Sequence, residues 1–74
     1  MSTLSMWVVY DHPLDYSTMF VARRHEVGGA GHQVTGDVLV SGELGVLRAQ
    51  LRRNGLVRLP RDPEDDRTIM ETWL

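Results

Sequence analysis

One stretch of the chain has the pattern of an amphipathic helix, and it limits the folds that are open to the rest. In SGELGVLRAQLRRN, residues 41–54, three leucines recur at helical spacing: Leu44, Leu47 and Leu51. Ser41 is a suitable N-cap, and Gly55 directly follows the stretch as a stop. Elsewhere the apolar residues fall in short runs rich in β-branched and aromatic side chains, which is the composition of strands. A single helix among several strands predicts an α+β fold.

The strand-like runs give the expected order β-β-(β)-α-β-β. They cover residues 6–10, 18–27, 38–40, 56–60 and 68–74. The first two runs are close enough in sequence to pair antiparallel, and the third is either a strand or the lead-in to the helix. Residues 28–37, GGAGHQVTGD, contain four glycines and are predicted to be a flexible connection. We therefore expect a small antiparallel sheet with the single helix packed on one face.

The chain length and composition limit the class of protein. Seventy-four residues allow one domain, which we place at residues 6–74, after a loose tail of residues 1–5. Met1 and Met6 are alternative starts. The absence of cysteine excludes disulfides, Cys-zinc sites and thiol catalysis. No apolar run approaches the roughly 18 residues of a membrane span, so we expect a cytoplasmic protein with no membrane contact.

The charge is −2, and all eight basic residues are arginine. This balance argues against broad non-specific binding of nucleic acid, which normally requires a basic domain. Apolar periodicity and aromatic content predict the core. The expected core residues are Trp7, Val9, Phe20, Val21, Leu44, Leu47, Leu51, Leu56, Val57, Ile69 and Trp73. In the last strand we expect Ile69, Glu71 and Trp73 to share one face.

Residues 54–67, NGLVRLPRDPEDDR, resemble the DNA-contacting wing of MarR-type winged-helix repressors. The shared pattern is a helix ending in Gly, then Leu-Val, basic residues and an Asp-Pro turn before a returning strand. In that family a helix-turn-helix precedes the wing, whereas strand-like and Gly-rich residues precede the only helix here. We therefore expect the likeness to reflect common hairpin chemistry. The tip is also acidic, with Asp62, Glu64, Asp65 and Asp66.

A second resemblance covers most of the chain. Trp7, the turn Tyr-Asp-His-Pro, the strand Phe-Val-Ala-Arg and Asp-Asp followed by Glu-x-Trp are similar to a set of short uncharacterised bacterial proteins. Ser17 stands where that pattern has proline. The resemblance implies one compact domain over residues 6–74 and identifies no catalytic residue.

Two groups of residues carry candidate chemistry. Asp11, His12 and Asp15 share one turn, where acid and imidazole could bind a metal or act in acid-base catalysis, although an ordinary turn is the favoured interpretation. His12 and His25 could also form a two-histidine site with Asp65 or Asp66. The GGAG stretch lacks the residues of a P-loop and is interpreted as a connector.

The arginines provide the candidate binding surface. It consists of Arg23, Arg24, His25, Arg48, Arg52, Arg58 and Arg61. If Tyr10 or Trp73 lay between them, such a surface could stack single-stranded bases. The alternative is that the arginines pair with Glu26, Glu71 and the Asp cluster across the sheet.

These observations predict a non-enzymatic module that binds a protein partner or itself, without a cofactor or metal. The reasons are the lack of a convincing nucleophile and base, and a chain too small for a typical enclosed substrate pocket. One alternative is a nucleic-acid-binding accessory protein that uses the arginines. Another is a small metal-dependent enzyme built from His12, His25 and the carboxylates.

Overall fold

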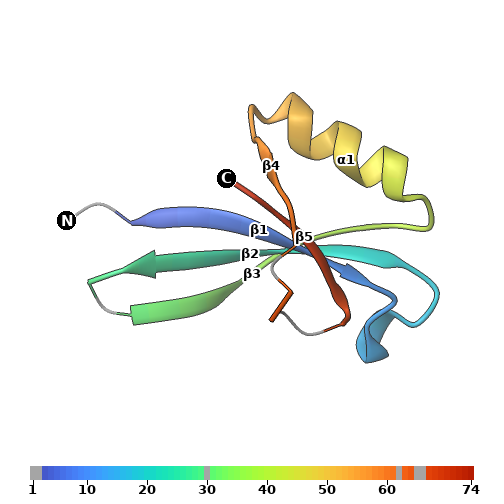
Figure 1. The fold of residues 1–74 in the computed structure, drawn as a ribbon, viewed down its shortest axis with the longest axis horizontal. Coiled ribbons are helices and arrows are strands. Elements are labelled where there is room, and N and C mark those ends of the chain that lie inside the picture. The colour runs from blue at the N-terminus through green and yellow to red at the C-terminus, as the bar shows by residue number, and fades with distance from the viewer. Residues whose placement is uncertain (1–2, 30, 62, 65–66) are drawn as a thin grey trace.

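The computed structural model describes residues 3–29, 31–61, 63–64 and 67–74, in which one helix covers one face of a five-stranded antiparallel sheet (Figure 1). The strands run in the spatial order β3-β2-β1-β5-β4. The elements are β1 (Leu4–Asp11), a 3-10 helix (Leu14–Tyr16), β2 (Phe20–Gly28), β3 (Gly31–Ser41), α1 (Leu44–Arg53), β4 (Arg58–Leu59) and β5 (Ile69–Trp73). The predicted α+β class and antiparallel sheet are confirmed.

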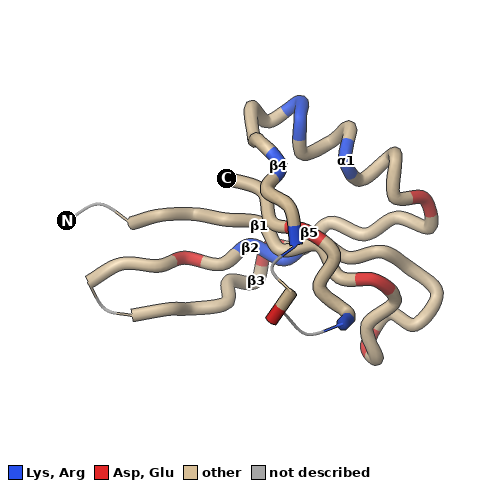
Figure 2. Tube along the Cα trace, viewed as in Figure 1, with Lys and Arg blue, Asp and Glu red and all other residues tan. Residues whose placement is uncertain are grey.

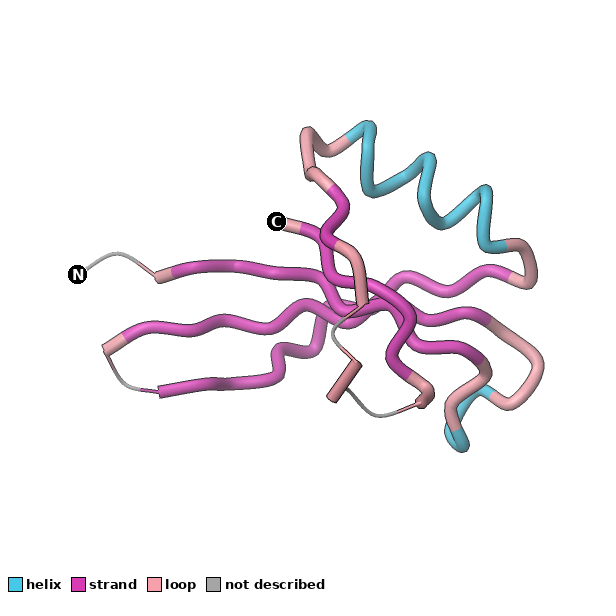
Figure 3. The backbone as a smooth tube through the Cα atoms, viewed as in Figure 1, coloured by secondary structure: helices cyan, strands magenta, loops and turns pink. Residues whose placement is uncertain are grey.

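The N-terminal half forms a three-stranded meander, which Figure 3 shows in magenta. β1 pairs antiparallel with β2, as expected, and begins at Leu4, so residues 4 and 5 belong to the sheet and not to the tail. The prediction of a flexible connection at residues 28–37 is wrong for Gly28, which ends β2, and for residues 31–37, which belong to β3. Gly28 pairs with Gly31, whose φ of 102° is open to glycine, so the chain reverses tightly and pairing resumes at once.

A bulge interrupts the pairing of β2 with β3. Arg23 pairs with Val38 and His25 pairs with Val34, so Arg24 faces the three residues between them on β3. The Thr35 hydroxyl donates a hydrogen bond to the Arg24 carbonyl at 3.0 Å. This bond takes the place of the backbone hydrogen bond that the bulge interrupts. Because bulges bend a strand away from a straight edge, this one makes the outer strand β3 a poorer template for a further strand.

Helix α1 connects the two outer strands of the sheet by crossing one face (Figure 1). It starts later than expected: the N-cap is Glu43, and Ser41 instead accepts the Glu43 N–H at 3.1 Å. Its predicted stop is confirmed. The N–H of Gly55 donates to Arg52 and that of Leu56 to Leu51, the two bonds of a Schellman motif, with Gly55 at φ 79°.

The core lies between α1 and the sheet. Its buried members are Val9, Ala22, Leu47, Leu51 and Trp73, with Trp7, Phe20, Leu39, Leu44, Leu56 and Met70 packed around them. Val21 is buried on the opposite face of the sheet. Most of the expected core is therefore confirmed. Val57 is the exception at 65% exposure, because it lies in the connection after the helix, where it pairs with Leu74 at the rim of the sheet.

A second bulge changes the face of one predicted core residue. Val9 pairs with Glu71 while Tyr10 pairs with Ile69, so Met70 is the extra residue on β5. Ile69 consequently lies on the face of Tyr10, opposite to Glu71 and Trp73, and the prediction that all three share a face is wrong for Ile69. Glu71 and Trp73 face the helix.

In the C-terminal hairpin, β4 pairs antiparallel with β5. This confirms the prediction that the wing-like stretch is part of a hairpin. One helix precedes it, and strands β1 to β3 precede that helix, so within the described residues no helix-turn-helix is present. The acidic residues Asp62, Asp65 and Asp66 lie outside the described residues. In the described part of the chain, α1 is the longest helix and is too short and too polar to cross a membrane.

Candidate binding pocket beside Glu71

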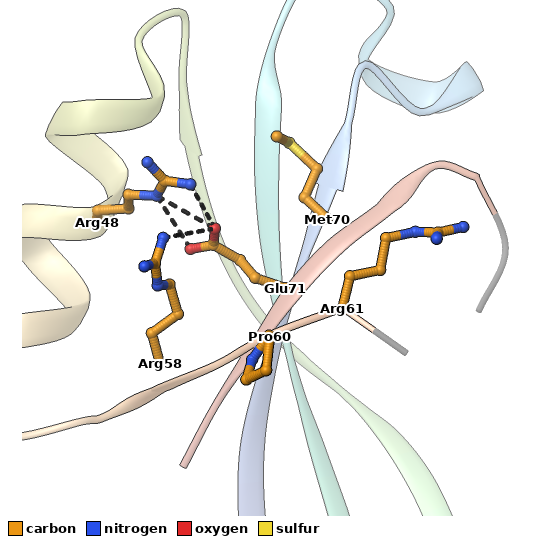
Figure 4. Close-up of a pocket in the computed structure, with 6 residues that line it drawn as sticks. All are labelled: Arg48, Arg58, Pro60, Arg61, Met70 and Glu71. Atoms are coloured by element: carbon orange, nitrogen blue, oxygen red, sulfur yellow. Dashed lines mark hydrogen bonds and ion pairs between the residues drawn. The ribbon is translucent and has the colours of Figure 1, made fainter. Parts of the chain in front are cut away.

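A nearly buried carboxylate lies where α1, β4 and β5 meet. Glu71 on β5 is only 3% exposed, and the Arg48 side chain on α1 binds its carboxylate (Figure 4). The Arg48 Nε lies 3.2 Å from each carboxylate oxygen, and its Nη2 lies 2.6 Å from Oε1. A guanidinium that binds both oxygens holds the carboxylate in one orientation as well as neutralising it.

Two more groups complete the surroundings of Glu71. The Trp73 indole Nε1 donates to Oε2 at 2.7 Å, and the Arg58 Nη1 approaches Oε1 to 3.9 Å from β4. Burial alone would raise the pKa of the Glu71 carboxyl. The hydrogen bonds from Arg48 and Trp73 and the charges of Arg48 and Arg58 outweigh burial, so the Glu71 pKa lies below its ordinary value. Glu71 is therefore ionised at neutral pH.

A cavity of about 300 Å³ opens beside this ion pair. Glu71, Arg48 and Arg58 form its charged wall, and Pro60 and Met70 give it an apolar one. Arg61 also lines the cavity, but its side chain extends away from Glu71, and its Nε donates to the Ile69 carbonyl at 3.1 Å (Figure 4). The mixed lining suits a ligand that combines negative charge with an apolar portion.

Arginine dominates the charge around the cavity. Residues 44–61, which include α1 and β4, contain five arginines and no acidic residue. Figure 2 shows arginines in blue along α1 and on β4, and Arg61 follows β4. The Arg52 guanidinium lies 5.5 Å from the centre of the Trp73 ring, on the surface above the buried indole. Among the described residues, Arg52 and Arg53 make no ion pair.

The structure divides the arginines that the sequence grouped into one surface. Arg48, Arg52, Arg58 and Arg61 gather near β5. Arg23, Arg24 and His25 follow one another on β2 and therefore alternate between its faces.

Local acids neutralise the two arginines on β2. Arg24 pairs with Asp37 at 2.5 Å and with Glu26 at 2.6 Å, and these contacts raise its pKa. Arg23 pairs with Asp15 and lies 5.9 Å from the Tyr16 ring. Of the acids named in the predicted alternative, Glu26 pairs with Arg24 and Glu71 pairs with Arg48, whereas Asp15 and Asp37 are partners that the sequence did not suggest. Trp73 forms no open platform beside the other arginines, because its ring is buried.

Side-chain and backbone contacts hold the turn at residues 11–16. His12 at φ 49° contacts the Asp11 carboxylate, and its ring meets Phe20 edge-on at 4.7 Å. The N–H of His12 donates to Met19 and closes the connection between β1 and β2. His25 pairs with Met6, six residues along β1 from His12, which corresponds to about 20 Å of strand. The proposed site with His12, His25 and Asp65 or Asp66 lacks this convergence, and both aspartates lie outside the described residues.

Sequence reasoning did not identify Glu71 as the centre of the cluster. The available signal was ETW, residues 71–73, in which alternation puts Glu71 on the face of an aromatic core residue. An acid on a core face requires a cationic partner. Arg48 is 23 residues away in the sequence, so that partner was visible only in the fold.

Comparison of this chain with family models, with curated proteins and with solved structures finds no match.

Proposed function

We propose that this protein is a non-enzymatic binding module that recognises an acidic segment of a partner protein through the surface around Glu71. The observation that carries the proposal is the convergence of Arg48 and Arg58 on one carboxylate, with Arg52 over the ring of the neighbouring Trp73, in a segment without acids. One carboxylate cannot balance three guanidinium groups, so the surface keeps an excess of positive charge for an incoming acid.

Arg58 supplies accessible donors at the cavity. Its side chain is 50% exposed, and its contact with Glu71 at 3.9 Å is too long for a hydrogen bond. Arg48, by contrast, binds both carboxylate oxygens of Glu71 through its Nε and Nη2 and orients the carboxylate. The planar fork of Arg58 matches a second carboxylate in a two-bond arrangement, which is the geometry that distinguishes arginine from lysine.

Two observations favour a protein over a nucleic acid. The Trp73 ring is buried and its N–H is bonded to Glu71, so its indole face is not open for base stacking beside the arginines. The cavity wall of Pro60 and Met70 instead fits an apolar side chain next to an acidic one.

Fluorescence anisotropy with a labelled oligoglutamate peptide at low salt tests the proposal. We expect the wild-type protein to bind this peptide and to show no binding of labelled oligolysine. Arg58→Gln should weaken binding roughly two- to fivefold, because an exposed charge pair contributes about 0.5–1 kcal/mol. Arg23→Gln is the matched control, since it removes the same charge on a different strand, and it should leave binding unchanged.

Equal weakening by Arg58→Gln and Arg23→Gln would mean that only net charge matters, and it would contradict a defined site. Tighter binding of oligothymidylate than of oligoglutamate would favour the nucleic-acid alternative. Sedimentation equilibrium of the protein alone tests whether the surface binds a second copy of the chain. A dimer that Arg58→Gln abolishes would make a second copy of the chain the occupant of this surface.

A further inference from the structure

Two histidines lie in contact on the face of the sheet that α1 does not cover. His25 on β2 and His32 on β3 are diagonal neighbours, because His25 pairs with Val34 and His32 pairs with Val27. The His25 Nδ1 lies 2.8 Å from the His32 Nε2, and the ring centres are 5.0 Å apart. The surface around Glu71 is on the opposite face and uses neither histidine.

Tyr10 fixes the orientation of His25. The Tyr10 hydroxyl lies 3.3 Å from the His25 Nε2. When the Nε2–H donates to this hydroxyl, the Nδ1 lone pair faces His32. Histidines that bind metals are commonly held in this way, with the second ring nitrogen bonded to an outer group that sets the tautomer and the ring angle.

The pair borders a cavity of about 340 Å³ lined by Tyr10, Thr72 and the apolar side chains of Met6, Val8 and Ile69. His25 is only 6% exposed, whereas His32 is exposed at the outer strand.

We propose that His25 and His32 form a two-imidazole site for a divalent transition-metal ion that prefers nitrogen ligands, such as Zn²⁺ or Cu²⁺. Two imidazoles on a tetrahedral Zn²⁺, with bonds of about 2.0–2.1 Å, place their nitrogens about 3.3 Å apart. The present separation of 2.8 Å thus has to widen by only about half an ångström. His32 is able to make this movement because it is exposed, and its proton shifts to Nδ1.

Water would complete the coordination shell. Within the described ranges, no group of three or more His, Asp or Glu side chains is arranged around a metal position, so the protein supplies two ligands. The cavity provides space for the water ligands. Imidazole nitrogen selects Cu²⁺, Ni²⁺ and Zn²⁺, with Cu²⁺ bound most tightly, whereas Mg²⁺ and Ca²⁺ prefer oxygen and should not bind.

Isothermal titration of the tag-free protein with Zn²⁺ and with Cu²⁺ tests this site. We expect one ion per chain, and a loss of at least roughly tenfold in affinity for His32→Gln. This exposed substitution should leave the fold intact, which circular dichroism verifies. Tyr10→Phe should weaken binding by about tenfold through the outer contact. His12→Gln removes the third histidine, in the turn after β1, and should have no effect.

The Cu²⁺ complex provides a second readout. Its electron paramagnetic resonance spectrum should show nitrogen coupling from two imidazoles in the wild-type protein and from one in His32→Gln. The inference is overturned if the wild-type protein binds neither ion. It is also overturned if His32→Gln binds as tightly as the wild type, or if His12→Gln weakens binding as much as His32→Gln does. None of these outcomes depends on the acidic-segment proposal.

Discussion

The Glu71 carboxylate is 3% exposed and remains charged, because protein groups replace its water. Arg48 contributes two donor atoms, Trp73 contributes one, and Arg58 adds a positive charge at 3.9 Å. Removing one member of a buried ion pair leaves the other member's charge uncompensated, which costs about 3–5 kcal/mol. Glu71 thus orients the Arg48 side chain, and its ion pair stabilises the packing of the helix on the sheet.

We predict that Glu71→Gln destabilises the protein at neutral pH and flattens the acid side of its stability profile. The folded-state pKa of Glu71 is lower than its ordinary value of about 4.5. The unfolded chain therefore binds this proton more readily, and the stability that Glu71 contributes is present above the unfolded pKa and lost as pH falls through the folded pKa. Urea unfolding from neutral pH into the acid range measures both effects.

The comparison of slopes decides the outcome. The wild-type free energy of unfolding should decline more steeply below pH about 4.5 than that of Glu71→Gln. Asp15→Asn, at the exposed pair with Arg23, is the control and should follow the wild-type curve. Parallel curves for the wild type and Glu71→Gln would show that the native state does not favour the ionised carboxyl.

Among the secondary-structure elements, α1 is followed by one glycine that the fold requires and contains another that it does not. Gly55 adopts φ 79° in the Schellman motif at the end of the helix, where an added side-chain carbon would meet no atom within 4 Å. Gly45 lies in the first turn of the helix, also with open space around it. The two sites therefore differ in backbone conformation and not in packing.

We predict that the same substitution at these two glycines has opposite effects. Gly55→Ala should lower the free energy of unfolding by about 1 kcal/mol, because alanine is strained in the left-handed region. Gly45→Ala should raise it by about 0.5–1 kcal/mol, because alanine favours the helix. Thermal unfolding should show shifts of about 4–8 °C per kcal/mol in opposite directions. Shifts of the same sign would contradict this account of how the helix ends.

The secondary-structure elements differ in how well their own residues predict them. The leucine spacing of α1 and its Asn-Gly stop are local signals, and both were sufficient to predict the helix. The bulges opposite Arg24 and at Met70 depend on the partner strand, so local alternation placed Ile69 on the wrong face. Residues 31–34 pair with β2 and residues 35–37 form the bulge that continues β3, although their own composition favours a loop.

At the scale of the whole molecule, charge is segregated along the chain. Five arginines and no acids occupy residues 44–61, while acids exceed arginines on both sides of this segment. The net charge of −2 hides this division, and it argued only against broad non-specific binding of nucleic acid. The strand order β3-β2-β1-β5-β4 then brings α1, β4 and β5 together. The candidate arginines were visible in the sequence, but their separation into neutralised and clustered groups required the fold.

The most direct test of the binding surface is a proton–nitrogen NMR titration of the protein with oligoglutamate. Trp7 and Trp73 are the two tryptophans, and the Trp73 indole N–H is bonded to Glu71 at the proposed site. We predict that the Trp73 indole signal and the amides of residues 48–61 shift progressively, while the His25 and His32 amides stay in place. Shifts centred on β2 and β3, with the Trp73 indole signal unmoved, would contradict the proposal that this surface binds an acidic partner.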